Sequence, residues 1–559
     1  MKRILCLIIA VFLCLSVLAS CNKSNSDIGN TANTDANTNA NTDTSSNTNA
    51  NTNTSTPSPS TSFSAEQPDI PATPVEEGLK YAEELDCIIN NAQIVAVNPL
   101  AAGGNAGSST VWVYKMIYEV LIVRVGENEY EPRLATSWVT EDYKTYTFKL
   151  RDDVTFHNGD KFTANDVVWT VHAGQEAVGT TTFETWNEVE SVTADDDYTV
   201  TFVLKTVNVE FLFNVSQPWA SILNERATTA DPEKGVWVGT GAWTITDFNT
   251  NDYVKLARND NYWGEKALTQ RLTLRFVPEE SARLMMLLNG ETDVCFALHP
   301  DDYAVVENDP DYDLYTVIYC SFNMLGFNMN DSITGDLNFR KAVASALNRD
   351  EITLIARGNY GIPESTGTYW GQSTEFRNND IPIIPYDLDK AREYLEASSY
   401  NGETVEIAAA INTNIYAAAV IQQELALIGI NTEVNQMDPV GLSSHASYTD
   451  NRSQIIVFAG AAAENAYSIR NHFYPGTAVN RASYNNPEVT ALFDLAPTVT
   501  DVNERRDLYM KIQEIVAEDI PYQNLFWLVN ATVCTKGVGG IELTANTFFD
   551  LNYIYKIID

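Results

Sequence analysis

The sequence predicts an α/β protein with more than one domain. The chain has 559 residues, too many for a single hydrophobic core. Segments with alternating polar and apolar residues, typical of strands, are mixed with segments of helical spacing. In the second half of the chain the two kinds follow one another in turn, which favours α/β layers.

The charge excludes several classes of partner. The formal net charge is −39 at pH 7. A surface this acidic repels phosphates and anionic lipid headgroups. We therefore expect no nucleic acid partner and no electrostatic attachment to an anionic membrane.

Residues 1–20 predict a signal peptide. Lys2 and Arg3 precede an apolar run that is shorter than a membrane-spanning helix needs. The run ends in "LASC", which resembles a bacterial lipobox, in which Cys21 becomes the lipidated first residue of the mature protein. The alternative is an uncleaved membrane helix.

Residues 21–82 are predicted to hold the lipidated cysteine and a disordered tether. The stretch "NTANTDANTNANTDTSSNTNANTNTSTPSPSTS" has almost nothing to bury, so it cannot offset the entropy cost of its own ordering. A flexible coil of this kind spans on the order of 40 Å, enough to hold a folded domain away from a membrane.

The mature chain keeps four further cysteines, which are widely scattered: Cys87, Cys295, Cys320 and Cys534. No CxxC motif occurs, so neither a zinc knuckle nor a thioredoxin-like site is indicated. We expect isolated buried thiols, with one disulfide as the open alternative. No metal site and no cofactor are predicted.

Individual elements can be placed along the chain. "CIINNAQIVAVNPL" and "KTYTFKLR" predict strands, and "ESVTADDDYTVTFVLK" predicts two strands around the turn Asp195–Asp197. "STVWVYKMIYEVLIVRV" has helical and then strand spacing. Helices are predicted at residues 280–289, 338–356, 388–398, 417–429, 487–496 and 502–518.

The stretch 147–170 contains a histidine and several aspartates, but its pattern is structural. Asn158-Gly159 predicts a tight hairpin turn with positive φ at both residues. Thr163, followed three residues later by Asp166, resembles a capping box. His157 has no second ligand at metal-binding spacing, so we interpret it as structural rather than catalytic or metal-binding.

A wider window carries a family resemblance. "EPRLATSWVTEDYKTYTFKLRDDVTFHNGDKFTANDVVWT", residues 131–170, strongly resembles the signature of the bacterial extracellular solute-binding proteins of the oligopeptide, dipeptide and nickel family, the capture subunits of ABC importers. Further windows follow in the family's order: "VGTGAWTI", "ARNDNYWG", "LGFNMND…FRKAVASALNRDEI", "YDLDKAREYLEASSY", "IQQELALIGINTEV", "NNPEVTALFDLA" and "ERRDLYMKIQEIVAEDIPYQNLF". The resemblance covers nearly all of residues 83–559.

The resemblance implies a two-lobed periplasmic-binding-protein-like (Venus flytrap) fold with an extra inserted domain on the first lobe. Its expected parts are lobe one at 83–105, 223–320 and 525–559, the inserted domain at 106–222, and lobe two at 321–524. The chain crosses between the lobes near Cys320–Phe327 and Pro521–Trp527, which would form a hinge. Ligand between the lobes would favour the closed state.

Several residues are candidates for the ligand site. In the family, the aromatic position of the "GTGxY/W" motif, here Trp243, tends to face the cleft; core packing is the alternative. Tyr369 and Trp370 sit in a Gly-flanked stretch and are further candidates. The crossing strands, with Asn323 and Met324 on one and Phe526 and Trp527 on the other, could offer backbone groups to an extended ligand.

One window departs from the family pattern. Peptide binders of this family often carry a Gly-Trp-x-x-Asp-like window whose aspartate pairs with the peptide's amino group. Here the window is Gly460-Ala461-Ala462-Ala463-Glu464, in which the acid is a glutamate and the tryptophan is absent. Glu464 is therefore either the ammonium partner, together with Gly460 at the ligand site, or a plain surface acid.

The resemblance implies a monomeric, lipid-anchored capture subunit for oligopeptides on the outer face of the cell membrane, working with ABC permease and ATPase subunits. One alternative is the same fold binding an oligosaccharide or a metal chelate. Another is a peptide sensor without transport. A secreted hydrolase is disfavoured because no GxSxG, HExxH or Walker motif occurs. We therefore predict a binding protein and not an enzyme.

Overall fold

The computed structural model describes residues 79–89, 97–101, 108–126, 129–178, 180–250, 252–296, 298–372, 374–461, 465–543 and 549–558. Five of their side chains, those of Ser108, Ser109, Tyr319, Cys320 and Ala461, are not described. The predicted signal peptide, the lipid-bearing Cys21, most of the tether and Glu464 lie outside these ranges.

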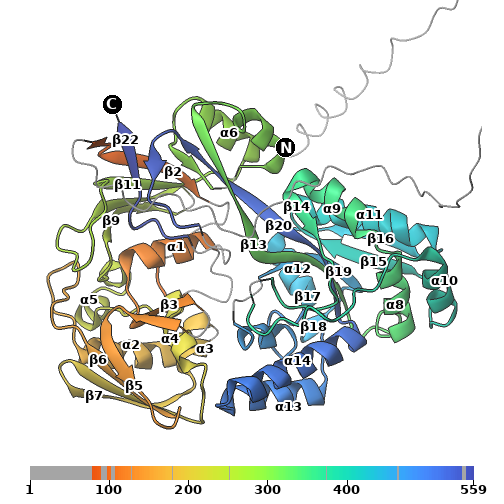
Figure 1. Cartoon of the computed structure of the whole chain (residues 1–559), viewed down its shortest axis with the longest axis horizontal. Coiled ribbons are helices and arrows are strands. Elements are labelled where there is room, and N and C mark those ends of the chain that lie inside the picture. Colours follow the sequence, from red (N-terminus) through yellow and green to blue (C-terminus); the bar gives the residue numbers. More distant parts are fainter. Residues whose placement is uncertain are drawn as a thin grey trace, which may run out of the picture. The chain divides into compact units, whose positions relative to one another are not determined.

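An eleven-stranded mixed sheet contains strands from both predicted lobes (Figure 1). Its strand order is β16-β15-β19-β13-β20-β12-β2-β11-β10-β9, and β14 pairs with β20 beside this path. The strands are β2 (Glu84–Ile89), β9 (Trp243–Asn249), β10 (Tyr253–Arg258), β11 (Arg271–Phe276), β12 (Val294–Cys295), β13 (Tyr312–Phe327), β14 (Gly361–Pro363), β15 (Thr404–Ala409), β16 (Asn431–Gln436), β19 (Ile455–Ala461) and β20 (Tyr522–Thr535).

The long antiparallel strands β13 and β20 connect the two halves of this sheet. Their pairing is irregular at the crossing, where the register shifts between Ile318 and Phe322 and again between Asn323 and Met324. Such bulges leave residues unpaired and bend a strand, so backbone rotation is absorbed most easily there. The irregular stretch coincides with the hinge that the sequence predicts.

The inserted segment forms its own small sheet, in the order β5-β6-β8-β7. These strands are β5 (Ala135–Val139), β6 (Thr145–Leu150), β7 (Val189–Asp196) and β8 (Thr199–Leu204), and a separate hairpin pairs β3 (Ile122–Gly126) with β4 (Glu129–Pro132). The helices here are α2 (Ala164–Glu176), α3 (Thr181–Trp186) and α4 (Phe211–Val215). Phe148, Trp186 and Phe202 lie in its core, which is distinct from that of lobe one.

Lobe two buries both faces of its strands. Along β13, Phe322 and Met324 join one core while Leu325 and Phe327 join the other, as the two-residue period of a strand requires. The helices of this lobe are α8 (Leu337–Ala346), α9 (Arg349–Arg357), α10 (Leu388–Glu396), α11 (Asn412–Leu427), α12 (Pro439–His445), α13 (Pro487–Leu495) and α14 (Val502–Asp519), and a short hairpin joins β17 (Ala446–Ser447) to β18 (Asp450–Asn451).

Lobe one contributes the remaining elements. They are α1 (Ser108–Ile117), α5 (Glu225–Ala230), α6 (Glu280–Leu288), α7 (Tyr303–Val306) and the sheet of β1 (Lys80–Tyr81), β22 (Tyr555–Ile558) and β21 (Val538–Gly539). Three cysteines, Cys87, Cys295 and Cys534, are buried thiols that form no disulfide with one another. They lie on the neighbouring strands β2, β12 and β20, so they are not isolated as predicted.

Two expected boundaries are corrected. The sequence predicts residues 108–117, which form α1, as part of the inserted domain. Trp112, Met116 and Ile117 instead pack in the core of lobe one, because the helix is apolar on the side that faces that core. Residues 80 and 81 were assigned to the tether, but they form β1, which pairs with β22 and closes its open edge.

The predicted helices are confirmed with one exception. The span 338–356 is two helices, α8 and α9, because Asn348 accepts a hydrogen bond from the Glu351 amide and starts a second helix. In the hairpin, Gly159 has φ of +84°, whereas Asn158 is not among the residues with positive φ, so the turn is not of the predicted kind. The capping box of Thr163 and Asp166 is present as predicted.

Candidate ligand-binding cavity

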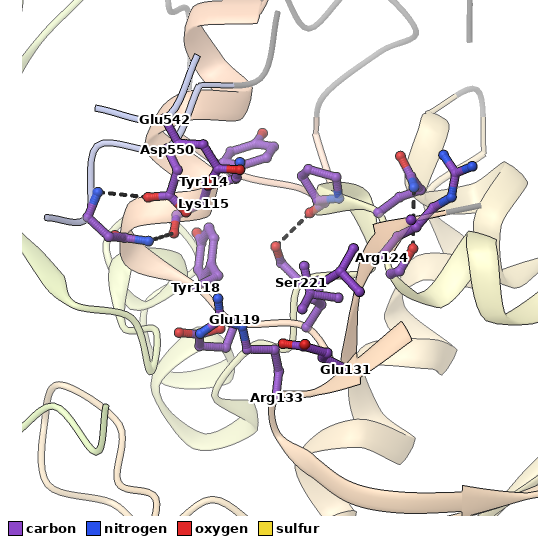
Figure 2. Close-up of a pocket in the computed structure, with 18 of the residues that line it drawn as sticks. Tyr114, Lys115, Tyr118, Glu119, Arg124, Glu131, Arg133, Ser221, Glu542 and Asp550 are labelled. Carbon is purple, nitrogen blue, oxygen red and sulfur yellow. Dashed lines mark hydrogen bonds between the residues drawn. The ribbon is translucent and has the colours of Figure 1, made fainter. Parts of the chain in front are cut away.

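A cavity in the described part of the chain has a volume of about 750 Å³ (Figure 2). Its walls come from α1 and the residues after it, from β3 and β4, from residues 216–221, from the C-terminal segment of lobe one, and from Gln372 and residues 374–376 of lobe two. The lining residues are Tyr114, Lys115, Tyr118, Glu119, Val120, Val123, Arg124, Val125, Gly126, Glu131, Arg133, Ser216, Gln217, Pro218, Ser221, Gln372, Thr374, Glu375, Phe376, Glu542, Asp550 and Asn552.

The glycines of the "VGTGAWTI" motif hold the α1 wall in place. An added Cβ at Gly239 would lie 1.8 Å from the Ile117 carbonyl oxygen, and one at Gly241 would lie 2.4 Å from that of Met116. No side chain fits there, because the loop runs directly against the end of α1. The Tyr118 hydroxyl donates a hydrogen bond to the Val236 carbonyl from the same contact. This motif therefore positions the cavity wall from behind.

His157 supports the same loop, as a structural histidine. Its Nε2 lies 3.1 Å from the Gly241 carbonyl oxygen, and its Nδ1 accepts a hydrogen bond of 3.2 Å from the Gly239 amide. These contacts suit the neutral ring with its proton on Nε2. Burial lowers the pKa of His157, which favours the same form.

Glu119, Glu131 and Arg133 lie at the lower side of the cavity in Figure 2. Glu119 is buried and accepts a hydrogen bond from the Tyr262 hydroxyl. Burial raises the pKa of Glu119 to about 6, opposed by the charge of Arg133 and by the Tyr262 hydrogen bond. Arg133 is half-buried and faces the cavity, so it can present a cation to a ligand.

The cavity presents charges of both signs. Its cations are Lys115, Arg124 and Arg133, and its carboxylates are Glu119, Glu131, Glu375, Glu542 and Asp550. The opposed groups are spread around the hollow rather than gathered on one side (Figure 2). A zwitterionic ligand can satisfy both signs at once, whereas a neutral one leaves charged groups to be desolvated without a partner.

Lobe two contributes a short wall, Thr374 to Phe376. All three of these residues are buried, and Asn465 donates a hydrogen bond of 3.5 Å to Glu375. Phe376 has φ of +57°, a left-handed conformation that a non-glycine residue adopts only where its surroundings hold it. Its ring stacks on Tyr509 with the centroids 5.6 Å apart.

A family model described as "Bacterial extracellular solute-binding proteins, family 5 Middle" matches residues 129–480, which is more than half of the chain. The chain belongs to this family. The match spans the inserted sheet, the crossing strand β13 and most of lobe two. Of the cavity walls it includes residues from β4, from the segment before α5 and from lobe two, whereas α1, β3 and the C-terminal segment lie outside it.

Individual relatives share about a quarter of their aligned residues with this chain. The nickel-binding periplasmic protein of Escherichia coli K12 is 27% identical over 303 residues, which cover 52% of this chain and 57% of that protein. The dipeptide-binding protein of the same strain is 24% identical over 459 residues, covering 75% and 84%. The solved structure of the ABC transporter substrate-binding protein CtaP from Listeria monocytogenes has a TM-score of 0.75 at 23% identity, covering 85% of this chain and 100% of that chain.

The structural likeness shows the two-lobed α/β fold of the periplasmic binding proteins. This family 5 protein has no helix within the described ranges that is both long and apolar enough to cross a membrane. The same ranges contain no group of three or more His, Cys, Asp or Glu side chains that could hold a metal ion.

The aromatic candidates are buried in this structure. Trp243 and Trp370 have no exposed surface, and Tyr369 is 6% exposed. Trp370 stacks on Phe473, and the Tyr369 hydroxyl contacts the Met324 sulfur. None of these residues lines the 750 Å³ cavity, because each fills a packed core instead. Contact between them and a ligand stays a prediction.

The crossing strands of this family 5 protein offer no free edge at the predicted residues. Asn323 and Met324 lie on β13, which is paired on one side with β19 and on the other with β20. Phe526 and Trp527 lie on β20 between β13 and β14. Addition of a ligand strand at these four positions would therefore require existing pairs to break.

The window around Glu464 is only partly described. Gly460 is buried and pairs with Phe322, and an added Cβ there would meet the Met324 side chain. Glu464 lies outside the described residues. Its neighbour Asn465 reaches the cavity region by its hydrogen bond to Glu375.

Glu119, Arg124, Arg133 and Glu375 line the cavity but are not among the site residues predicted from the sequence. Two signals for them were present. Glu119 and Arg124 interrupt the apolar run "MIYEVLIVRV", and Arg133 interrupts the pattern before the "LATSW" strand. A charged residue inside an apolar run needs a partner or water, so such positions are candidates for a polar cavity wall.

Proposed function

We propose that this protein is the substrate-binding subunit of an ABC importer and that it captures oligopeptides in the 750 Å³ cavity. It delivers them to permease and ATPase subunits in the cytoplasmic membrane, and it acts as a monomer. The relatives named for dipeptide binding and as an ABC transporter substrate-binding protein support this class of function.

The observation that carries the proposal is the composition of the cavity. Its walls come from both sides of the β13–β20 crossing and include three cations and five carboxylates. The volume lies within the range of about 300–1,000 Å³ typical of ligand pockets. A peptide with free ends is a zwitterion, so its two termini can pair with groups of opposite sign.

The structure supports an oligosaccharide ligand less well than a peptide ligand. Sugar recognition would use exposed aromatic faces, and the tryptophans considered for it, Trp243, Trp370 and Trp527, are at most 1% exposed. The chelate alternative rests on the relative named for nickel binding. The cations Arg124 and Arg133 would suit a chelate whose outer surface carries carboxylates.

Calorimetry with four probes tests the proposal: trialanine, N-acetyl-trialanine, maltotriose and the nickel–histidine complex. We expect trialanine to bind, and we expect acetylation to weaken binding because it removes the ammonium group. Binding of maltotriose or of the nickel complex alone would contradict the peptide assignment.

Glu464 is proposed as the partner of the peptide's ammonium group. Glu464→Gln should weaken trialanine binding by roughly 30-fold or more, since removal of one member of a desolvated charge pair costs about 2–5 kcal/mol. Acetylation should do little further harm to this variant, because both changes remove the same interaction. If the variant binds trialanine as tightly as the wild type, the assignment of Glu464 is wrong.

We also propose that Cys21 carries the lipid that holds the protein at the outer face of the cell membrane. Support comes from the "LASC" sequence and the apolar run before it. Cys21→Ala should remove detergent-phase partitioning in fractionated cells, because the thiol is the acylated group. Unchanged partitioning of the variant would exclude lipidation at this residue.

A further inference from the structure

The segment between β14 and α10 forms part of the cavity wall with little regular structure of its own. Its described residues contain one β-bridge, between Thr366 and Pro382, and no helix. Gln372 and residues 374–376 of this segment line the cavity. Because no ladder of backbone hydrogen bonds runs along this wall, side-chain contacts must hold it in place.

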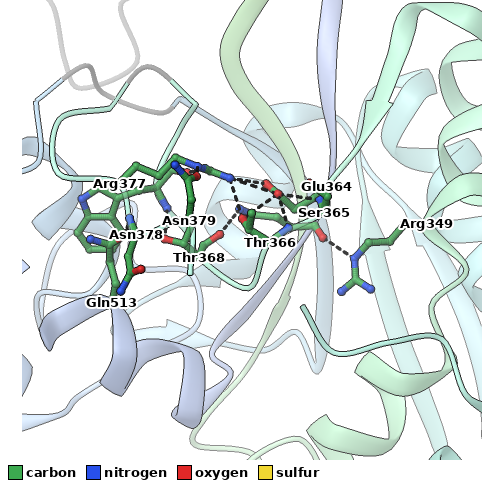
Figure 3. Close-up of polar contacts among 11 residues, drawn as sticks. Arg349, Glu364, Ser365, Thr366, Thr368, Arg377, Asn378, Asn379 and Gln513 are labelled. Atoms are coloured by element: carbon green, nitrogen blue, oxygen red, sulfur yellow. Dashed lines mark hydrogen bonds and ion pairs between the residues drawn. The ribbon is translucent and has the colours of Figure 1, made fainter. Parts of the chain in front are cut away.

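A buried ion pair closes the base of the segment (Figure 3). The side chains of Glu364 and Arg377 are 1% and 8% exposed, and Arg377 Nη2 lies 3.2 Å from Glu364 Oε1. The same oxygen accepts hydrogen bonds of 2.8 Å from the amides of Ser365 and Thr366. Glu364 therefore ties the first residues of the segment to Arg377, which directly follows the wall residue Phe376.

Arg377 extends this network to the crossing strand. Its Nη2 donates to the Thr366 hydroxyl at 2.7 Å, and its Nη1 donates to the Trp370 carbonyl. The guanidinium lies 5.4 Å from the ring centroid of Trp527, on β20. In addition, the Glu364 amide donates to the Leu525 carbonyl at 3.0 Å. Arg377 and the Glu364 backbone thus join the first part of the segment to the strand that links the lobes.

Gln513 of α14 holds the segment from the other side (Figure 3). Its Nε2 donates to the Phe376 carbonyl at 2.7 Å. Its Oε1 accepts from the Asn378 amide at 2.8 Å and from the Thr368 hydroxyl at 2.7 Å. These bonds fix the backbone of Phe376, the wall residue with positive φ.

We propose that Glu364, Arg377 and Gln513 are positioning residues for ligand binding. They hold the wall Thr374–Phe376 in the arrangement that a ligand meets, although none of the three lines the cavity. The inference rests on the proposed function in one respect, namely that ligand occupies this cavity.

Loss of the network lowers affinity by a population effect. A wall that samples several arrangements presents the binding-competent one only part of the time, and the apparent Kd rises by the inverse of that fraction. If the competent arrangement is populated about one tenth of the time, the Kd rises about tenfold.

The test compares Arg377→Met with a matched variant, Arg340→Met. Arg340 is also a buried arginine of lobe two; it donates to the carbonyls of Asp519 and Thr334, which do not line the cavity. Both variants lose a buried guanidinium, so both should melt at a lower temperature. We expect only Arg377→Met to raise the Kd for trialanine, by about tenfold, with Arg377→Lys intermediate.

Amide hydrogen exchange supplies a readout that needs no ligand. Arg377→Met, but not Arg340→Met, should speed exchange at residues 371–378 in the free protein. Gln513→Met, which changes no charge, should also speed exchange of the same residues. This second variant keeps the test valid if Arg377→Met fails to fold.

The outcomes separate this inference from the proposed function. Equal loss of affinity and equal exchange in Arg377→Met and Arg340→Met would overturn the positioning role and leave only a structural one. Absence of trialanine binding in the wild type would contradict the peptide assignment, while the exchange comparison would still decide the positioning role. Faster exchange confined to Arg377→Met and Gln513→Met supports it.

Discussion

Glu210 and Arg505 form a buried ion pair between the inserted domain and lobe two. Glu210 precedes α4, Arg505 lies in α14, and their side chains are 3% and 7% exposed with Oε1 and Nε 3.6 Å apart. Asn465 of lobe two donates to Glu210 at 2.8 Å. The Val209 amide also donates to the Pro497 carbonyl at 2.9 Å. These contacts can form only while the inserted domain and lobe two are packed together, so they stabilise the closed state.

Glu210→Gln is therefore expected to favour the open state. In the closed state the variant leaves Arg505 buried without its counter-charge, whereas in the open state water solvates it. We expect a shift of about 2–3 kcal/mol, which raises the Kd for trialanine by about ten- to a hundredfold. Small-angle scattering of the bound protein should show a larger radius of gyration.

Asp389→Asn is the matched control for this change. Asp389 pairs with Arg392 on the surface of α10 and is 96% exposed. Exposed pairs contribute little, so scattering and affinity should match those of the wild type. If Glu210→Gln behaves like Asp389→Asn, the buried pair does not contribute to closure.

Gly239→Ala should destabilise the protein through a steric clash. The new Cβ would lie 1.8 Å from the Ile117 carbonyl oxygen, so the loop or the end of α1 must move. We expect a loss of about 3 kcal/mol or more in the free energy of unfolding. Gly402→Ala is the control: its φ is +94° but nothing lies within 4 Å, so only backbone strain of about 1 kcal/mol is added. If urea unfolding shows the same loss of stability for Gly239→Ala and Gly402→Ala, the close approach of Gly239 to the Ile117 carbonyl is contradicted.

Glu119 should make the binding of an anionic ligand depend on pH. Burial raises its pKa to about 6, so below that pH the carboxyl is neutral and no longer compensates Arg133. We expect the wild type to bind N-acetyl-trialanine several-fold more tightly at about pH 5 than at about pH 7.5. Glu119→Gln should lose most of this difference in calorimetry. An equal pH dependence in both proteins would assign the effect to another group.

Glu424 should reduce stability at high pH. It is 4% exposed; its Oε1 accepts from the Asn348 amide at 3.0 Å, and its Oε2 has no hydrogen-bond partner among the described residues. Burial raises its pKa to about 8, so the folded protein binds this proton more tightly than the unfolded chain does. The resulting stabilisation is complete below about pH 4.5 and is lost as the pH rises through about 8.

Glu424→Gln keeps the acceptor for Asn348 and removes the ionisation. We expect the variant to be more stable than the wild type by about 1–3 kcal/mol at about pH 8.5, with little difference near pH 5. Urea unfolding at the two pH values measures this. Glu433→Gln, at an exposed glutamate of β16, serves as the control and should change little. A constant difference at both pH values would show that the effect is not linked to this proton.

The tertiary contacts explain where sequence reasoning about the site was incomplete. Buried and cleft-facing tryptophans have the same local pattern, so Trp243 and Trp370 could not be separated from ligand-facing residues by spacing alone. Glu375 and Arg133 are far apart in the sequence and meet at one cavity only because the inserted domain and lobe two close on it. The Glu364–Arg377 pair likewise depends on a segment without regular periodicity.

The sequence by itself determined the α/β class, the order of the helices, the capping box at Thr163 and the family, because periodicity, turn chemistry and motif order are local properties of the chain. Only the tertiary structure decided which residues face the cavity, that α1 packs in lobe one, and that Glu210 meets Arg505. These facts depend on contacts between segments hundreds of residues apart, and such contacts arise from the packing of whole lobes rather than from any local pattern.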